Sequence, residues 1–223
     1  TALLINPNTT ASVTAQLLAQ LAPYCPDGIT LHGITASFGD PYIASEAGYI
    51  TAGHAVLDAF DQHVDEFGLP HAVLVGCFGD PSVWALRARY PELPVMGLAE
   101  AAMREALAHG PFAVVTGGSA WGPILERLAR GLYLGAPQGL LKVSTLPQSG
   151  GDMLQSPEAA KAALAQACQR TAEDCPQAKA MVLGGAALGG WAQELSAHVP
   201  IPLIDNVAAG GRWLNQALTS ARP

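Results

Sequence analysis

The stretch Val73-Leu74-Val75-Gly76-Cys77-Phe78-Gly79-Asp80-Pro81 predicts a short buried strand that ends in a glycine and a thiol. A brief apolar run bounded by turn residues is typical of a strand buried on both faces. In open α/β sheets, ligands bind beyond the carboxyl ends of the strands. Cys77 therefore stands at a position where a functional site is expected.

A second stretch, Met181-Val182-Leu183-Gly184-Gly185-Ala186-Ala187, repeats this pattern with Gly185 at the position of the thiol. Gly76 and Gly184 are 108 residues apart. A repeat of this length is too long for a solenoid unit and suits two α/β lobes related by a pseudo-two-fold axis. In such a pair, the two glycine-containing strand ends can face each other across one cleft.

Strand and helix patterns alternate along both halves of the chain. Strands are expected at 2–5, 29–34, 73–75, 94–98, 112–115, 140–145, 181–183 and 202–204, and helices at 13–21, 49–67, 82–90, 100–109, 121–131, 158–171, 191–197 and 207–218. Residues 36–48 and 147–156 are expected to be long loops, the first of them over a site. The predicted fold class is α/β, with two pseudo-two-fold-related lobes of mostly parallel sheets flanked by helices. Residues 1–109 form the N-terminal lobe and 110–223 the C-terminal lobe, whose last helix is expected to cross back to the first.

Composition excludes several classes of partner. Half of the residues are hydrophobic, only 13% are charged, and the formal net charge is −7. No basic stripe is present, so no nucleic acid is expected, and no apolar stretch reaches the roughly 18 to 20 residues of a membrane helix. No secretory signal pattern is present, which favours a cytoplasmic protein. The low charge density fits a homo-oligomer that buries part of its surface.

Cysteine and histidine spacing gives no sign of a bound metal. The four cysteines form no CxxC pair and the six histidines form no HxH or HExxH motif. Reduced thiols and no metal site are therefore expected. The glycine-rich stretch after Leu183 does not match GxGxxG, and neither GxSxG nor a Walker lysine occurs.

Cys77 is the strongest candidate for chemistry. A thiol at the junction of a strand and a helix is expected to have a lowered pKa, because the helix N-terminus stabilises the thiolate. A thiolate can serve as a base toward a carbon acid or as a nucleophile. The alternative is that Cys77 is a packed core residue, since free cysteine is often buried.

Two polar turns lie at Asn6–Thr10 and Thr116–Ser119. They follow the strands that are expected to lie beside the strands ending at Cys77 and Gly185. Their hydroxyl, amide and backbone N–H groups suit a carboxylate or an enolate oxygen, although simple helix capping is an equal alternative. The expected substrate contacts are the polar groups of Asn8, Thr9, Thr116, Gly117 and Gly118, and the backbones of Phe78, Gly79, Ala186 and Ala187 as an anion cradle.

With these motifs in place, the chain resembles the aspartate/glutamate/hydantoin racemase superfamily, most closely its hydantoin and allantoin racemases. The resemblance spans nearly the whole chain and rests on Ile5–Thr10, Gly76–Pro81, Pro94–Met103 and Pro202–Asp205. It implies two α/β lobes with the site between them, no cofactor, no metal, oligomeric assembly and a small carboxylate or hydantoin-like substrate. It also implies two catalytic cysteines, one on each face of the substrate.

The first catalytic cysteine carries over to Cys77, whereas Gly185 occupies the position of the second. No Ser, Thr, Asp, Glu or His lies within residues 181–190 to replace it. Three explanations are open: an engineered removal of the second thiol, a natural protein with one-sided chemistry, or a second acid supplied by water or a more distant group.

Three functions follow from these explanations. The first is a cofactor-independent racemase of the hydantoin type that uses Cys77. The second is a single-cysteine decarboxylase similar to the arylmalonate decarboxylases, or a maleate-type isomerase. Arylmalonate decarboxylases carry their single cysteine in the second half, so protonation here would come from the opposite face. The third is a non-catalytic protein that binds a small carboxylate or ureide.

Overall fold

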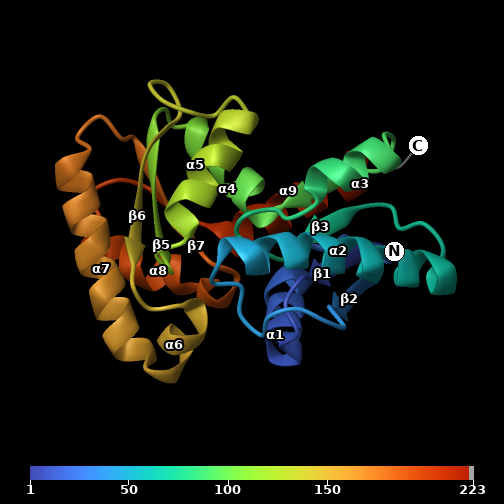
Figure 1. Ribbon diagram of the computed structural model, residues 1–223. Coiled ribbons are helices and arrows are strands. Elements are labelled where there is room, and N and C mark those ends of the chain that lie inside the picture. Colours follow the sequence, from blue (N-terminus) through green and yellow to red (C-terminus); the bar gives the residue numbers. More distant parts are fainter. Residues whose placement is uncertain (221–223) are drawn as a thin grey trace.

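The computed structural model describes residues 1–220 and places two parallel four-stranded sheets side by side (Figure 1). The first sheet has the order β2-β1-β3-β4 and the second β6-β5-β7-β8, so each repeats the same topology. The strands are β1 (Ala2–Asn6), β2 (Leu31–Thr35), β3 (Val73–Val75), β4 (Val95–Gly97), β5 (Phe112–Gly117), β6 (Leu140–Leu146), β7 (Ala180–Gly184) and β8 (Leu203–Asp205). This arrangement confirms the predicted fold class.

Helices cover both faces of each sheet. They are α1 (Ala11–Leu21), α2 (Glu46–Phe67), α3 (Val83–Arg89), α4 (Leu98–Leu107), α5 (Trp121–Gly131), α6 (Gly150–Gln155), α7 (Pro157–Asp174), α8 (Trp191–Leu195) and α9 (Asn206–Ser220). Three short 3₁₀ helices are η1 (Ala22–Tyr24), η2 (Ala186–Leu188) and η3 (Ser196–His198). No helix among residues 1–220 combines the length and the apolar character that crossing a bilayer requires.

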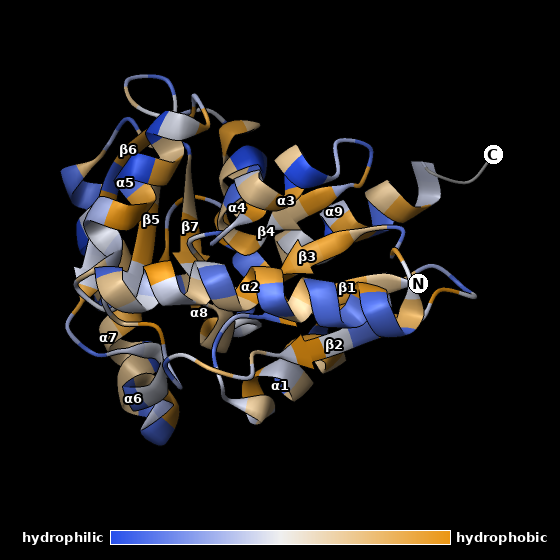
Figure 2. Ribbon diagram, turned by 45° about the vertical axis from the view of Figure 1, so that its right-hand side comes forward, coloured by the Kyte–Doolittle hydropathy of each residue, from blue (hydrophilic) through white to orange (hydrophobic). Residues whose placement is uncertain are grey.

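The central strands are the most buried elements, as their sequences predict. Every residue of β1, β3 and β7 is buried, because helices pack on both faces of a parallel sheet. Figure 2 shows the apolar strand β3 inside the first lobe and β7 inside the second, with helix α2 in front of the first sheet carrying hydrophilic residues. Helix α1 buries Val13, Leu17 and Leu21, which lie four residues apart on one face.

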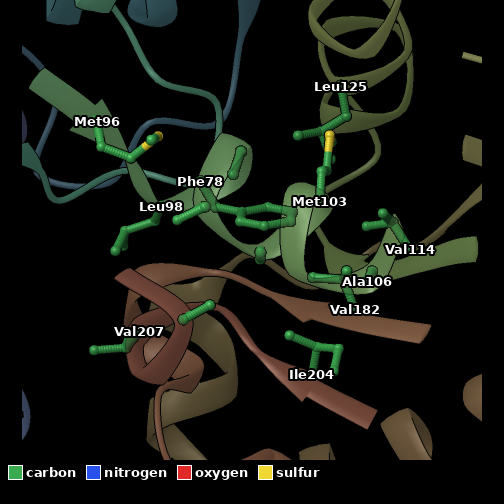
Figure 3. Packing of buried hydrophobic residues seen from close by; sticks show 14 of the residues in the cluster. Phe78, Met96, Leu98, Met103, Ala106, Val114, Leu125, Val182, Ile204 and Val207 are labelled. Atoms are coloured by element: carbon green, nitrogen blue, oxygen red, sulfur yellow. The ribbon is translucent and has the colours of Figure 1, made fainter. Parts of the chain in front are cut away.

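One apolar cluster joins the two lobes. Figure 3 shows Phe78, Leu98 and Met103 of the first half packed with Val182 and Ile204 of the second. Helix α9 packs on α1 and α4, and its Leu214 and Leu218 cover Ala2 and Ala72 of the first sheet. The last helix of the chain therefore completes the core of the first lobe.

One predicted loop is corrected by the structure. Residues 147–156 contain α6, which begins after Ser149. Ser149 and Asp152 form a capping box: the Ser149 hydroxyl oxygen accepts from the Asp152 N–H at 3.2 Å, and the Ser149 N–H donates to the Asp152 carboxylate at 2.9 Å. This pair satisfies N–H groups that a first helical turn otherwise leaves free, which stabilises a helix despite its two glycines.

Candidate functional site

A cavity of about 70 Å³ lies beyond the carboxyl ends of β1, β3, β5 and β7 and is lined by both lobes. Cys77 follows β3 and Gly185 follows β7, so the two positions related by the sequence repeat share this cavity. Parallel strands bring their carboxyl ends to one edge of each sheet, and the pseudo-symmetry brings the two edges together. The cavity is the candidate active site.

Most of the residues predicted for the site line this cavity. They are Cys77, Gly185, Asn8, Phe78, Thr116, Gly117, Ala186 and Ala187. Thr9, Gly79 and Gly118 lie outside the lining. The Thr9 N–H donates to the Asp40 carbonyl at 3.2 Å, the Gly118 N–H donates to the Leu146 carbonyl at 2.8 Å, and Gly79 packs against the Trp121 ring.

Several residues that line the cavity were not predicted from the positions of the strand ends. They are Val13, Tyr42, Ile43, Trp121, Gly150 and Leu188. The glycines Gly76 and Gly184, at the two strand ends expected to face one cleft, also line the cavity. Tyr42 and Ile43 belong to the predicted loop over a site, so the polar composition of 36–48 was the available signal. Trp121 begins the helix after the Thr116 turn. No sequence pattern indicates its contact with Gly79 of the other lobe.

The Cys77 thiol is buried, and this corrects the expected direction of its pKa. Helix α3 begins only at Val83, six residues beyond Cys77, so no helix N-terminus adjoins the sulfur. Burial raises the pKa of Cys77 above its usual value, and the nearby Asp80 carboxylate raises it further. At neutral pH Cys77 is therefore a thiol, which is the form that can donate a proton.

The loop that carries Cys77 is held from both sides. The Tyr49 hydroxyl donates to the Gly79 carbonyl at 2.8 Å, and the Tyr49 and Trp121 rings meet edge to face at 6.2 Å. Burial, with a smaller effect of Cys77, raises the pKa of Tyr49 to about 12, so its hydroxyl stays protonated as a donor.

Asp80 anchors the other end of this loop. Its backbone has a φ of 57°, and its carboxylate accepts from the N–H groups of Ala99 and Glu100 at 2.9 and 2.7 Å. Asp80 thus caps the first turn of α4. Burial raises the pKa of Asp80 to about 7, although these two N–H groups oppose the shift.

Two further acidic residues near strand ends, Asp205 and Glu100, also have structural partners. Asp205 accepts from the N–H groups of Val207 and Ala208 at 2.9 and 3.0 Å and so caps α9. Glu100 caps no helix; it pairs with Arg87 at 2.9 Å and Arg104 at 2.8 Å.

Asn8 presents an amide to the cavity. Its Oδ1 accepts from the Asn6 Nδ2 at 3.0 Å and from the Thr10 N–H at 2.9 Å, which fixes the side chain. The fully buried Asn6 also donates to the Thr14 hydroxyl at 3.0 Å. Within residues 1–220 the Asn8 Nδ2 donates no hydrogen bond, so this NH₂ group is free to meet a ligand oxygen.

Backbone donors complement Asn8. In the part of the chain that the structure describes, the N–H groups of Phe78, Gly185 and Ala186 donate no hydrogen bond, and all three residues line the cavity. The Thr116 hydroxyl donates to the Gly184 carbonyl at 2.8 Å and so ties the ends of β5 and β7 together. The cavity therefore offers neutral hydrogen-bond donors from both lobes to an oxygen atom.

Gly185 has a backbone conformation that suits glycine. Its φ is 133° and its ψ is 124°, a region that L residues rarely adopt. A Cβ built there would lie 3.2 Å from the Leu188 side chain. The part of the cavity lining that follows β7 is thus shaped around a residue without a side chain.

No Lys, Arg, His, Asp or Glu of residues 1–220 lines the cavity. The same described residues contain no group of three or more His, Cys, Asp or Glu side chains that could hold a metal ion. Apart from the donors named above, the walls are apolar or aromatic. A charged ligand would therefore find no side chain of opposite charge among the described lining residues.

The Asp/Glu/Hydantoin racemase family model matches residues 3–212. A hydantoin racemase from Paenarthrobacter aurescens is 28% identical over 217 residues, covering 94% of this chain and 87% of that protein.

Solved structures of other proteins share the fold. An allantoin racemase from Klebsiella pneumoniae superposes with a TM-score of 0.86 at 23% identity, over 98% of this chain and 87% of that one. A double mutant of arylmalonate decarboxylase in its liganded form gives a TM-score of 0.71 at 18% identity, over 100% and 95% of the two chains.

Proposed function

The chain belongs to the Asp/Glu/hydantoin racemase family, and on that premise we propose that it is a cofactor-independent racemase that inverts the α-carbon of a hydantoin-like ring. The observation that carries this proposal is the shared cavity of Cys77 and Gly185, with a thiol on one side and no charged residue anywhere in its described lining. Relatives named as hydantoin racemases support the same substrate class.

The uncharged lining favours a neutral ureide ring over a free amino acid. A zwitterionic amino acid or a dicarboxylate would bring charges that no lining side chain of residues 1–220 can pair. A hydantoin ring instead carries carbonyl oxygens, which the Asn8 amide and the free N–H groups can bind. Aromatic and aliphatic walls suit the ring faces and a small substituent.

The proposed chemistry begins with the removal of the α-proton. The electron pair of the C–H bond moves into the adjacent carbonyl, and the backbone N–H groups of Phe78 and Ala186 stabilise the resulting enolate oxygen. Cys77 gives or takes the proton on one face. Because burial raises its pKa, its thiolate is a stronger base toward a weak carbon acid than an exposed thiolate would be.

This function predicts that Cys77→Ser loses racemisation by at least about 100-fold, since a serine hydroxyl is a much weaker acid than a thiol. The measurement follows optical rotation and α-deuterium uptake in D₂O, starting from each enantiomer of a 5-substituted hydantoin and of allantoin. Cys175→Ser, which changes a half-buried thiol outside the cavity, is the matched control and should keep wild-type rates. If the wild type neither exchanges nor inverts any of these compounds, the racemase proposal is wrong.

A single-thiol decarboxylase is the second candidate function. It is favoured by the one thiol in an uncharged cavity, because a carboxylate held there is poorly solvated and its loss as carbon dioxide is promoted. Cys77 would then protonate the enediolate from its own face. Incubation with a prochiral arylmalonate should release carbon dioxide and give one enantiomer, whereas a racemic product would exclude protonation by Cys77.

A further inference from the structure

Racemisation requires a proton carrier on each face of the carbanion, and Gly185 supplies none. Among the described lining residues, the side chains that carry an N–H, O–H or S–H proton are Asn8, Tyr42, Cys77, Thr116 and Trp121. Amide, aliphatic hydroxyl and indole groups do not ionise in the range where enzymes work, whereas thiols and phenols do. The lining therefore offers two ionisable protons, on Cys77 and on Tyr42.

We propose that Tyr42 is the second acid–base group, acting on the face of the substrate opposite Cys77; this rests on the racemase function proposed above. Tyr42 belongs to the first lobe, between β2 and α2, but its ring packs on α6 of the second. A Cβ at Gly151 would lie 2.9 Å from Cδ2 and Cε2 of Tyr42. The ring therefore stands against the second lobe, which also carries Gly185.

A short chain of contacts links this ring to the Gly185 turn. Helix α6 packs on η2, the 3₁₀ turn that follows Gly185 directly. A Cβ at Gly150 would lie 3.3 Å from the Ala187 Cβ, so the α6 backbone touches that turn. Tyr42, Gly185 and Cys77 line the same cavity of about 70 Å³, so a ring bound in it is expected to meet both the phenol and the thiol.

The position of Tyr42 is fixed, while its hydroxyl is left available. The Thr10 hydroxyl donates to the carbonyl of Pro41 at 2.7 Å, which anchors the residue before Tyr42 to the turn after β1. Within residues 1–220, no hydrogen bond is formed by the Tyr42 hydroxyl. Tyr49 differs, since its hydroxyl is bound to the Gly79 carbonyl.

The step balances without any further reactant. In one direction the Tyr42 phenolate takes the α-proton, the C–H electron pair forms the enolate, and the Cys77 thiol donates its proton to the opposite face. The enzyme then holds a phenol and a thiolate, which is the form that catalyses the reverse direction. Proton exchange with solvent interconverts the two forms between turnovers.

The test is Tyr42→Phe, studied by α-deuterium exchange on each hydantoin enantiomer in D₂O. We expect inversion to fall by at least about 100-fold, because one face loses its proton carrier. The enantiomer whose α-proton faces Cys77 should still exchange, with retention and within about threefold of the wild-type rate, while the other enantiomer should not. Cys77→Ser should show the reverse selectivity. A structural role for Tyr42 would slow both reactions together and so would not produce this split.

Tyr133→Phe is the matched control, because Tyr133 is 96% exposed and lies outside the cavity. Inversion by Tyr42→Phe at the wild-type rate would overturn the assignment of Tyr42 and leave the racemase function intact, with water as the second proton source. Equal loss of exchange from both enantiomers in a folded Tyr42→Phe protein would also overturn it. A wild type that inverts no hydantoin would instead overturn the racemase proposal itself.

Discussion

At the scale of single residues, Cys77 and Gly185 differ in backbone conformation as well as in side chain. Cys77 is 6% exposed and packs in the core of the first lobe, with Tyr49 and Asp80 holding its loop. Gly185 instead has a φ of 133°. Its backbone therefore follows a path that a cysteine would strain.

Gly185→Cys should consequently destabilise the protein by about 1–3 kcal/mol, the usual cost of an L residue in a sparsely populated backbone region. Urea unfolding followed by circular dichroism measures this difference. Gly122→Ala is a suitable control, because Gly122 has no positive φ and a Cβ there would only touch Thr145 at 3.9 Å. A fully stable Gly185→Cys that racemises faster than wild type would show that this turn readily accepts a second thiol.

The residues of the site were predictable to different degrees. Cys77, Gly185 and Asn8 follow strands, and the rule that parallel strands end at one edge was sufficient to find them. Tyr42 was indicated only as part of the loop 36–48 expected over a site, and the place of Trp121 in the cavity depends on the packing of one lobe against the other, which no local pattern encodes. The pKa of Cys77 was expected to fall and instead rises, because burial depends on tertiary packing that sequence alone does not give.

At the scale of elements, boundaries depend on caps as well as on periodicity. Helix α2 begins at Glu46, three residues before the apolar pattern predicts, because the Ser45 hydroxyl accepts from the Gly48 N–H at 3.0 Å. Helix α4 begins at Leu98 because its cap, Asp80, comes from a distant loop. The strands β5 and β7, which periodicity and burial define, differ from the prediction by one or two residues.

Helix α2 packs on β2 through a histidine that has no hydrogen-bond partner. His63 is 1% exposed, and neither of its ring nitrogens is bonded within residues 1–220. Its ring meets His32 of β2 at 5.5 Å and Phe67 at 5.2 Å. Burial and His32, with a smaller effect of the chain N-terminus, lower its pKa, although Glu66 opposes the shift. The folded protein therefore holds a neutral imidazole at this contact.

This arrangement predicts a loss of stability in mild acid. The histidine of the unfolded chain takes up a proton near pH 6.5, whereas folded His63 resists protonation until a lower pH. The free energy of unfolding should therefore fall as pH decreases below about 6.5 and level off below the folded pKa. His63→Leu should remove part of this slope, as measured by Tm at pH 8 and pH 5. The exposed control His198→Gln should keep the full slope, and an unchanged slope in His63→Leu would contradict the prediction.

At the scale of the whole molecule, the repeat produces two lobes that share a core. Besides the apolar cluster in Figure 3, the Gln20 Nε2 of α1 donates to the Gly189 carbonyl of the second half at 2.8 Å. Helix α9 lies so close to the first lobe that a Cβ at Gly210 would come within 2.7 Å of Leu98. Catalysis at the proposed site between the lobes would require this fixed arrangement, because the groups on the two sides of a small cavity must keep their relative positions.

The division at residue 109, which the repeat predicts, should therefore not yield two independent folding units. A chain of residues 1–109 lacks α9 and leaves Ala2, Ala72 and the α9 face of α4 without their cover. We expect this piece to show no cooperative thermal transition by circular dichroism, and co-expression with residues 110–223 to restore a folded complex. The full chain should unfold in one transition that coincides for far-ultraviolet and tryptophan signals. A cooperative transition of the 1–109 piece alone would mean that α9 only adds stability to a lobe that already folds. The shared core would then not be what keeps the two sides of the cavity in a fixed relative position.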